Sequence, residues 1–169
     1  MFLKISAFID SINIRIGKVV QWLTISLVLI QFSVVVLRYI YGFNSTIMQE
    51  SILWIYGIMV FCSSSWAYLL DTHVRVDVAY QGFNTKRKAI VDIMGAIFLM
   101  LPLLVVLWIY VYPYVMSSWR ILEKSFEADG IPAVYILKSF LLLFVVQMFL
   151  QTISEIIKKV HVCLECKDS

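Results

Sequence analysis

The longest uncharged stretch of the chain is Ile93–Trp119, IMGAIFLMLPLLVVLWIYVYPYVMSSW, which includes no Asp, Glu, Lys or Arg. A transmembrane helix needs roughly 20 apolar residues to cross the hydrocarbon core of a bilayer. This stretch is therefore long enough to span a membrane. Pro102 lies within it, and we expect a kink there because proline lacks the backbone N–H that the helix requires.

Three other uncharged runs flank this stretch: Val19–Leu37, Ser51–Leu70 and Ser139–Ser154. The first two have the length of a membrane span. The third is shorter, and it reaches that length if its helix begins near Ile131 and tolerates Lys138. The pattern predicts four membrane-spanning helices.

The composition supports the same conclusion. Of the 169 residues, 62% are hydrophobic and 15% are charged, whereas an ordinary soluble domain is about half apolar and a quarter charged. We predict an all-α membrane protein rather than a soluble enzyme. Its single four-span domain covers residues 1–169, with spans at about 19–40, 48–70, 90–112 and 131–157 and a tail at 158–169. The net charge of +3 is too small to indicate a nucleic-acid partner.

The segment before the first span carries charged side chains throughout and lacks the short apolar core of a cleavable signal peptide. Apolar residues recur there at spacings of three and four, which predicts an amphipathic helix over residues 1–18, lying in the membrane interface. A cytoplasmic extension of the first span is the alternative. The apolar stripe consists of Phe2, Ile5, Ile9, Ile12 and Ile16.

The distribution of basic residues predicts the orientation in the membrane. Ten of the 14 Lys and Arg residues lie in the N-terminal segment, in the loop after the second span and in the C-terminal tail. Short cytoplasmic loops are enriched in Lys and Arg. Both termini and residues 71–92 are therefore expected to be cytoplasmic.

Groups that could carry catalysis, ion coupling or metal binding are scarce in the spans. An ionisable residue at the centre of a span costs about 2.5–3.5 kcal/mol on insertion scales, so it usually marks a function. Lys138 alone approaches this position, and we expect it to snorkel outward or pair with an acidic neighbour, with a role toward a substrate anion as the alternative. Cys163 and Cys166 are expected to be reduced tail thiols rather than half of a metal site. We therefore expect no catalytic, substrate-binding or metal site and no cofactor.

Two sets of residues are candidates for structural contacts. Arg38 ends the first span and Glu50 begins the second, so the short loop between them could bring the two together as an ion pair. Small and hydrogen-bonding residues allow membrane helices to approach closely. Such residues could serve internal packing or a partner helix, and they are Gly57, Ser64, Gln147 and Gln151.

Several short motifs occur in one order along nearly the whole chain. They are Arg38-Tyr39, Asn44 with Gln49-Glu50, His73-Val74-Arg75-Val76-Asp77, and the loop Glu123–Pro132 followed by Lys138. In this order they resemble the small membrane subunit (DctQ-like) of tripartite ATP-independent periplasmic (TRAP) transporters. The most distinctive is the motif at residues 73–77, which is similar to the H-x-R-x-D segment of that family.

The resemblance implies a non-enzymatic subunit of the bacterial inner membrane that braces a large membrane transport subunit. In that family a periplasmic binding protein captures the substrate, usually an organic acid anion, and the large subunit carries the sodium and substrate sites. The resemblance also implies that His73, Arg75 and Asp77 form a cytoplasmic interfacial motif. The outer residues that could dock the binding protein by charge are Arg120, Glu123, Lys124 and Glu127.

Two other functions stay open at this point. A small self-contained transporter working as a homo-oligomer would need a membrane-embedded carboxylate, and the spans contain none at their centres. A structural four-span subunit of an unrelated complex is opposed only by the motif at residues 73–77 and by the outer loop.

Overall fold

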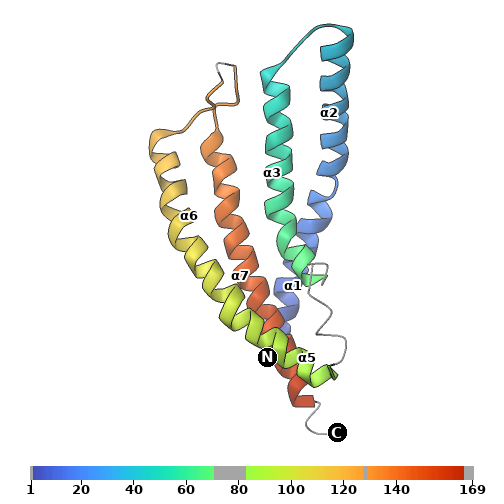
Figure 1. The fold of residues 1–169 in the computed structure, drawn as a ribbon, viewed down its shortest axis with the longest axis vertical. Coiled ribbons are helices and arrows are strands. Elements are labelled where there is room, and N and C mark those ends of the chain that lie inside the picture. Colours follow the sequence, from blue (N-terminus) through green and yellow to red (C-terminus); the bar gives the residue numbers. More distant parts are fainter. Residues whose placement is uncertain (1, 71–82, 128, 166–169) are drawn as a thin grey trace.

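A computed structural model describes residues 2–70, 83–127 and 129–165 of the chain. All regular elements in these residues are helical (Figure 1). They are α1 (Phe2–Val20), α2 (Leu23–Ile40), α3 (Thr46–Leu69), α5 (Thr85–Gly95), the π-helical η1 (Ala96–Met100), α6 (Leu101–Ile121) and α7 (Val134–Glu165). The predicted all-α class is confirmed.

Four helical segments are long and apolar enough to cross a membrane, as the uncharged runs predicted. They are Leu3–Ile40, Thr46–Leu69, Thr85–Arg120 and Val134–Leu164. The first joins α1 to α2 through a tight turn at Gln21 and Trp22, and the third runs without interruption through α5, η1 and α6.

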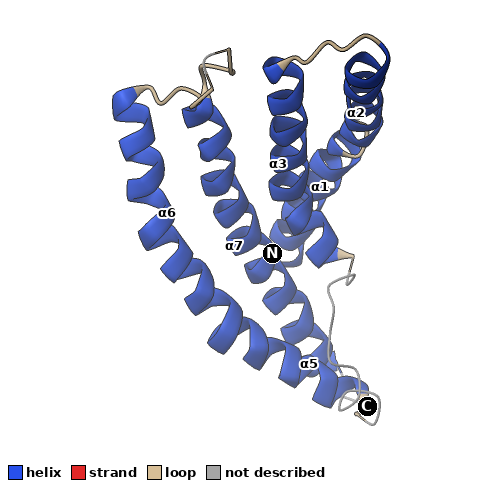
Figure 2. Cartoon of the chain, turned by 45° about the horizontal axis from the view of Figure 1, so that its top comes forward, coloured by secondary structure: helices blue, strands red, loops and turns tan. Residues whose placement is uncertain are grey.

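Helix α7 is the centre of the fold, because α1, α3, α5 and α6 all pack against it. Helix α2 packs mainly on α3, and Figures 1 and 2 show α2, α3, α7 and α6 spread apart toward the interhelical loops. The small core consists of Leu104 of α6 with Val145 and Met148 of α7. The result is an open fan in which α2, which the structure describes in full, has no buried residue.

The third span bends next to Pro102, where the sequence predicted a kink. Residues Ala96–Met100, directly before this proline, form a π-helical segment, and the helix curves along the fan in Figure 2. Proline cannot donate a backbone hydrogen bond and its ring collides with the carbonyl one turn earlier, so a wider turn relieves the collision. The curvature carries α5 across the far end of α7.

Helix α1 packs through polar residues and through part of its predicted apolar stripe. Ser6, Asn13 and Ile9 are buried against the other helices, whereas Ile5 and Ile12 of the stripe are exposed. This arrangement suits a helix whose outer face meets lipid, because lipid tails do not penalise exposed apolar side chains. Whether α1 lies in the interface or extends the first span stays a prediction.

Candidate functional site

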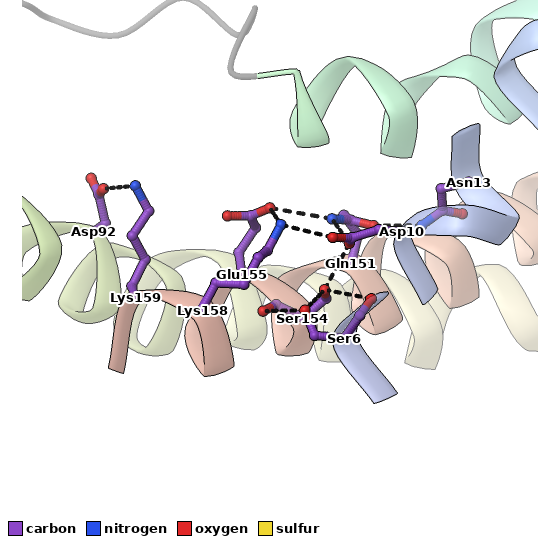
Figure 3. A network of polar contacts seen from close by, with 9 residues as sticks. All are labelled: Ser6, Asp10, Asn13, Asp92, Gln151, Ser154, Glu155, Lys158 and Lys159. Atoms are coloured by element: carbon purple, nitrogen blue, oxygen red, sulfur yellow. Dashed lines mark hydrogen bonds and ion pairs between the residues drawn. The ribbon is translucent and has the colours of Figure 1, made fainter. Parts of the chain in front are cut away.

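A buried polar network joins α1 to α7 near the chain termini (Figure 3). Its centre is the amide of Gln151, whose side chain is 0% exposed. Asn13 Nδ2 donates to Gln151 Oε1 at 2.6 Å. Gln151 Nε2 donates to Asp10 Oδ1 at 3.0 Å and to Glu155 Oε1 at 3.3 Å. Every polar atom of this buried amide therefore has a partner within the chain.

The carboxylate of Asp10 receives further donors from α7. Ser154 Oγ donates to it at 2.8 Å, and Lys158 Nζ lies 3.1 Å from it while also pairing with Glu155. The hydroxyl groups of Ser6 and Ser154 are 2.7 Å apart. Buried charges are tolerated only when they are paired and hydrogen-bonded. The network satisfies this requirement and clamps α1 to α7.

Helix α5 is tied to the same end of α7. Lys159 Nζ lies 2.8 Å from Asp92 Oδ2, which connects the two helices by an ion pair. The thiol of Cys163, which is free, lies 3.9 Å from the backbone carbonyl of Lys86. The end of α7 thus holds both the first helix and the start of the third span.

The residues predicted to form a partner-helix face are largely used inside the chain. Gln151 is enclosed by the network, so of the two roles left open for it the structure shows internal packing. A side chain at Gly57 would press on Leu137 of α7, so this glycine lets α3 and α7 approach. Ser64 Oγ donates to the carbonyl of Val60 in its own helix. The physical reason is the central place of α7, which turns its polar stripe inward.

Gln147, the fourth member of that set, differs from the others. Its side chain is 5% exposed, and neither its amide nitrogen nor its amide oxygen has a hydrogen-bond partner among the residues that the structure describes. It lies one turn from Gln151 on the buried side of α7. The network therefore ends at Gln151.

At the opposite end of the fan, Lys138 of α7 pairs with Glu123 at 2.5 Å. Its ammonium also lies 4.2 Å from the centre of the Tyr114 ring, and Ser118 Oγ donates to the same carboxylate. The hydrogen bonds from Lys138 and Ser118 hold the pKa of Glu123 below its usual value. Lys138 is thus paired with an acidic neighbour.

The predicted ion pair between Arg38 and Glu50 is absent from the structure, which describes both residues. Glu50 Oε2 instead accepts the backbone N–H of Ile131 at 2.5 Å, and Glu50 Oε1 accepts Ser125 Oγ. Arg38 is exposed on α2. The prediction failed because the start of α3 faces the loop before α7 rather than the end of α2.

The loop between α6 and α7 begins with an unusual turn. Leu122 has φ 46° and ψ 56°, the left-handed conformation that ends many helices and that glycine adopts most easily. Glu123 N then donates to the Ser118 carbonyl at 3.1 Å. This turn directs the Glu123 side chain back toward Lys138.

The four residues expected to dock a binding protein are not equivalent. Arg120, Lys124 and Glu127 are exposed, but Glu123 is engaged with Lys138 and Ser118. The interfacial motif, His73, Arg75 and Asp77, lies outside the described residues, as does Cys166.

Between α6 and α7 the structure contains a groove with an entirely apolar lining. Within the described residues, no group of three His, Cys, Asp or Glu side chains could hold a metal ion. The polar chemistry of the described chain is concentrated at its two ends, where it joins helices.

The family model of the DctQ component of tripartite ATP-independent periplasmic transporters matches residues 5–161. The chain belongs to this family. As a DctQ component it is a multi-pass membrane protein and a small component of a TRAP transporter. Neither the search of the curated proteins nor that of the solved structures found a match.

Proposed function

We propose that this DctQ component is the non-enzymatic small subunit of a sodium-coupled TRAP transporter that imports an organic acid anion. It lies in the bacterial inner membrane with both termini in the cytoplasm. It braces the large transport subunit and contributes to docking of the periplasmic binding protein. Sodium and substrate bind to those partners, so this chain has a mechanical role.

The observation that supports this proposal best is the pairing of charged side chains between the helices at both ends of the fan. Asp10, Gln151 and Lys158 bind one another at one end, and Glu123 and Lys138 bind one another at the other. Side chains held in such pairs stabilise a fixed arrangement of helices. A fixed arrangement is what a brace requires.

The two outer helices of the fan are suited to contact another membrane subunit. Val28 of α2 and Ile109 of α6 are exposed and apolar, and each of these helices packs mainly on one neighbour. Each helix therefore has a free face for van der Waals packing, which drives the association of membrane helices.

Reconstitution tests the function directly. Liposomes with an inward sodium gradient should take up substrate only when they contain this chain and the large subunit and when the binding protein is added. Dissipating the gradient with an ionophore is the matched control. Sodium-driven uptake by this chain alone would contradict the proposal and support a self-contained homo-oligomeric transporter.

A pair of matched variants tests the bracing role. Val28→Trp and Ile109→Trp each add bulk to one free face without touching the polar networks. At least one of them should abolish co-purification with the large subunit in detergent. Undiminished co-purification of both variants would contradict bracing through these helices.

A further inference from the structure

Gln147 and Ser65 are buried polar residues of the spans whose side chains have no hydrogen-bond partner among the residues that the structure describes. Gln147, on α7, is 5% exposed, and both its amide nitrogen and its amide oxygen lack a partner. Ser65, on α3, is 0% exposed, and its hydroxyl also lacks one. Buried polar groups in folded proteins are nearly always hydrogen-bonded, so each exception requires an explanation.

The two side chains lie at the same level of the contact between α3 and α7. The rings of Phe61 on α3 and Phe144 on α7 meet there, with their centres 5.9 Å apart. Both helices run in the same direction, away from the interhelical loops (Figure 1). Ser65 follows Phe61 by four residues, and Gln147 follows Phe144 by three. Residues three or four apart are neighbours on one helix face, so both polar side chains follow the ring contact by one turn.

Helix α1 closes the junction between α3 and α7, because it packs on both of them. Gly17 of α1 lies so close to the ring of Trp66, the neighbour of Ser65, that a side chain at this glycine would collide with the ring. Gln151, one turn from Gln147, binds the same helix through Asn13. The junction is therefore enclosed by three helices of this chain, out of reach of a partner subunit.

The chemistry of the junction fits a small neutral ligand. The amide of Gln147 offers two donors and an acceptor, and the hydroxyl of Ser65 offers a donor and an acceptor. Neither group carries a charge that would attract an ion. Buried water molecules make about three hydrogen bonds, typically to polar groups that have no other partner. Water is thus the ligand that these two side chains are suited to hold.

We propose that Gln147 and Ser65 hold one water molecule, which bridges the amide to the hydroxyl at the junction of α1, α3 and α7. The direct hydrogen bonds of the network between α1 and α7 end at Gln151. The bridge adds α3 to that polar clamp, one turn further from the chain termini. It concerns the folding of this chain and goes beyond the proposed transport function.

A double-mutant cycle, measured by thermal unfolding of the full chain in detergent, tests the bridge. Gln147→Met removes the amide with little change in volume, and Ser65→Ala removes the hydroxyl. Each should lower the melting temperature by about 2–4 °C, because the group left behind loses its partner. The double variant should melt no lower than the less stable single variant, since both substitutions break one bridge.

The matched control is Ser64→Ala, which removes a hydroxyl that donates to the Val60 carbonyl of its own helix. Its effect should simply add to that of Gln147→Met. A higher melting temperature for Gln147→Met than for wild type is the result expected of an amide buried without a partner, and it would overturn the inference. Strict additivity of Gln147→Met and Ser65→Ala would do the same.

A high-resolution cryo-EM map of the complex with the large subunit identifies the bridge itself. Separate density between the Gln147 amide and the Ser65 hydroxyl is expected, within hydrogen-bond distance of both. Two side chains in direct contact, with no density between them, would contradict the water even if the double-mutant cycle showed coupling.

Discussion

Lys138 and Glu123 stabilise the loop end of the fan as a single unit with Ser118 and Tyr114. The lysine lies in the second turn of α7, where an unpaired ammonium would be costly in an apolar environment. Glu123, across the loop, supplies the opposing charge at 2.5 Å. The pair therefore joins α6 to α7 at the point where the chain reverses direction.

The lowered pKa of Glu123 predicts how stability depends on pH. A carboxyl whose pKa is lower in the folded state adds stability that is complete above its unfolded pKa, about 4.3. That stability is lost as the pH falls from this value through the lowered folded pKa. Melting temperatures in detergent between pH 3 and pH 7, roughly the range in which carboxyls titrate, should therefore fall less steeply on acidification for Glu123→Gln than for wild type. Parallel curves for the two proteins would show that Glu123 contributes nothing.

Leu122 offers a second prediction at this scale. A residue other than glycine in the left-handed region costs about 1 kcal/mol or more, and the Leu122 side chain is half exposed, so little packing would be lost. Leu122→Gly should keep or raise thermal stability in detergent. Ile121→Gly, one position earlier inside the helix, is the matched control and should cost about 1 kcal/mol. Equal losses for both variants would contradict strain at Leu122.

Among the helices, the contact between α1 and α7 depends on the most buried polar groups. Asn13, Gln151 and Asp10 form a continuous chain of hydrogen bonds, and Ser6 meets Ser154 beside it. Removing one partner leaves another buried group unsatisfied, which costs more than the net value of the bond. The first helix is therefore part of the folded unit rather than a loose appendage.

Cross-linking tests this contact. In a background without native cysteines, Ser6→Cys with Ser154→Cys should form a disulfide under mild oxidation, because the two hydroxyl groups are 2.7 Å apart. Ser11→Cys with Ser154→Cys is the matched control and should not cross-link, since Ser11 lies on a different face of α1. Adding Asn13→Ala should lower the yield of the first disulfide by weakening the clamp, at a cost of about 1 kcal/mol. Equal yields for the two cysteine pairs would show that α1 does not dock as described.

The helices were predictable from the sequence, but their contacts were only partly so. Uncharged runs locate spans because the bilayer demands apolar length. The polar stripe containing Gln147 and Gln151 was also visible, yet its partner was not. The polar face of α1 carries Ser6 and Asn13, and periodicity indicates only that a polar face exists, not whether it meets water or another helix.

The contacts made by the loops could not be predicted from the sequence, for a different reason. Arg38 and Glu50 are close along the chain, but proximity in sequence does not determine where a side chain turns. Glu50 binds Ser125 and Ile131, far away in sequence, because the loop before α7 folds over the start of α3. No local signal indicates the left-handed turn at Leu122, because glycine or asparagine would be the usual residue there.

As a whole, the molecule has two chemically different ends. The start of α1, the start of α5 and the end of α7 lie together, and both short interhelical loops lie at the opposite end (Figure 1). Exposed basic residues, Lys4, Lys86 and Arg87 among them, lie near the first end. The loop end is mixed in charge, with the exposed acidic residues Glu127 and Asp129 beside the exposed basic residues Arg38, Arg120 and Lys124. All helix ends and loops at one end of the molecule must face the same side of the membrane. Knowing the side of one loop therefore determines the whole topology.

The excess of Lys and Arg near the termini predicts that this end is cytoplasmic. In cells whose outer membrane is permeabilised, a membrane-impermeant thiol reagent should label Asp129→Cys but not Asn84→Cys, in a background without native cysteines. Lysing the cells should make both positions reactive, since both residues are exposed. Labelling of position 84 alone in unlysed cells would invert the topology and place the loop between α6 and α7 in the cytoplasm. A periplasmic protein could not then dock on that loop, so this measurement tests a premise of the proposed function.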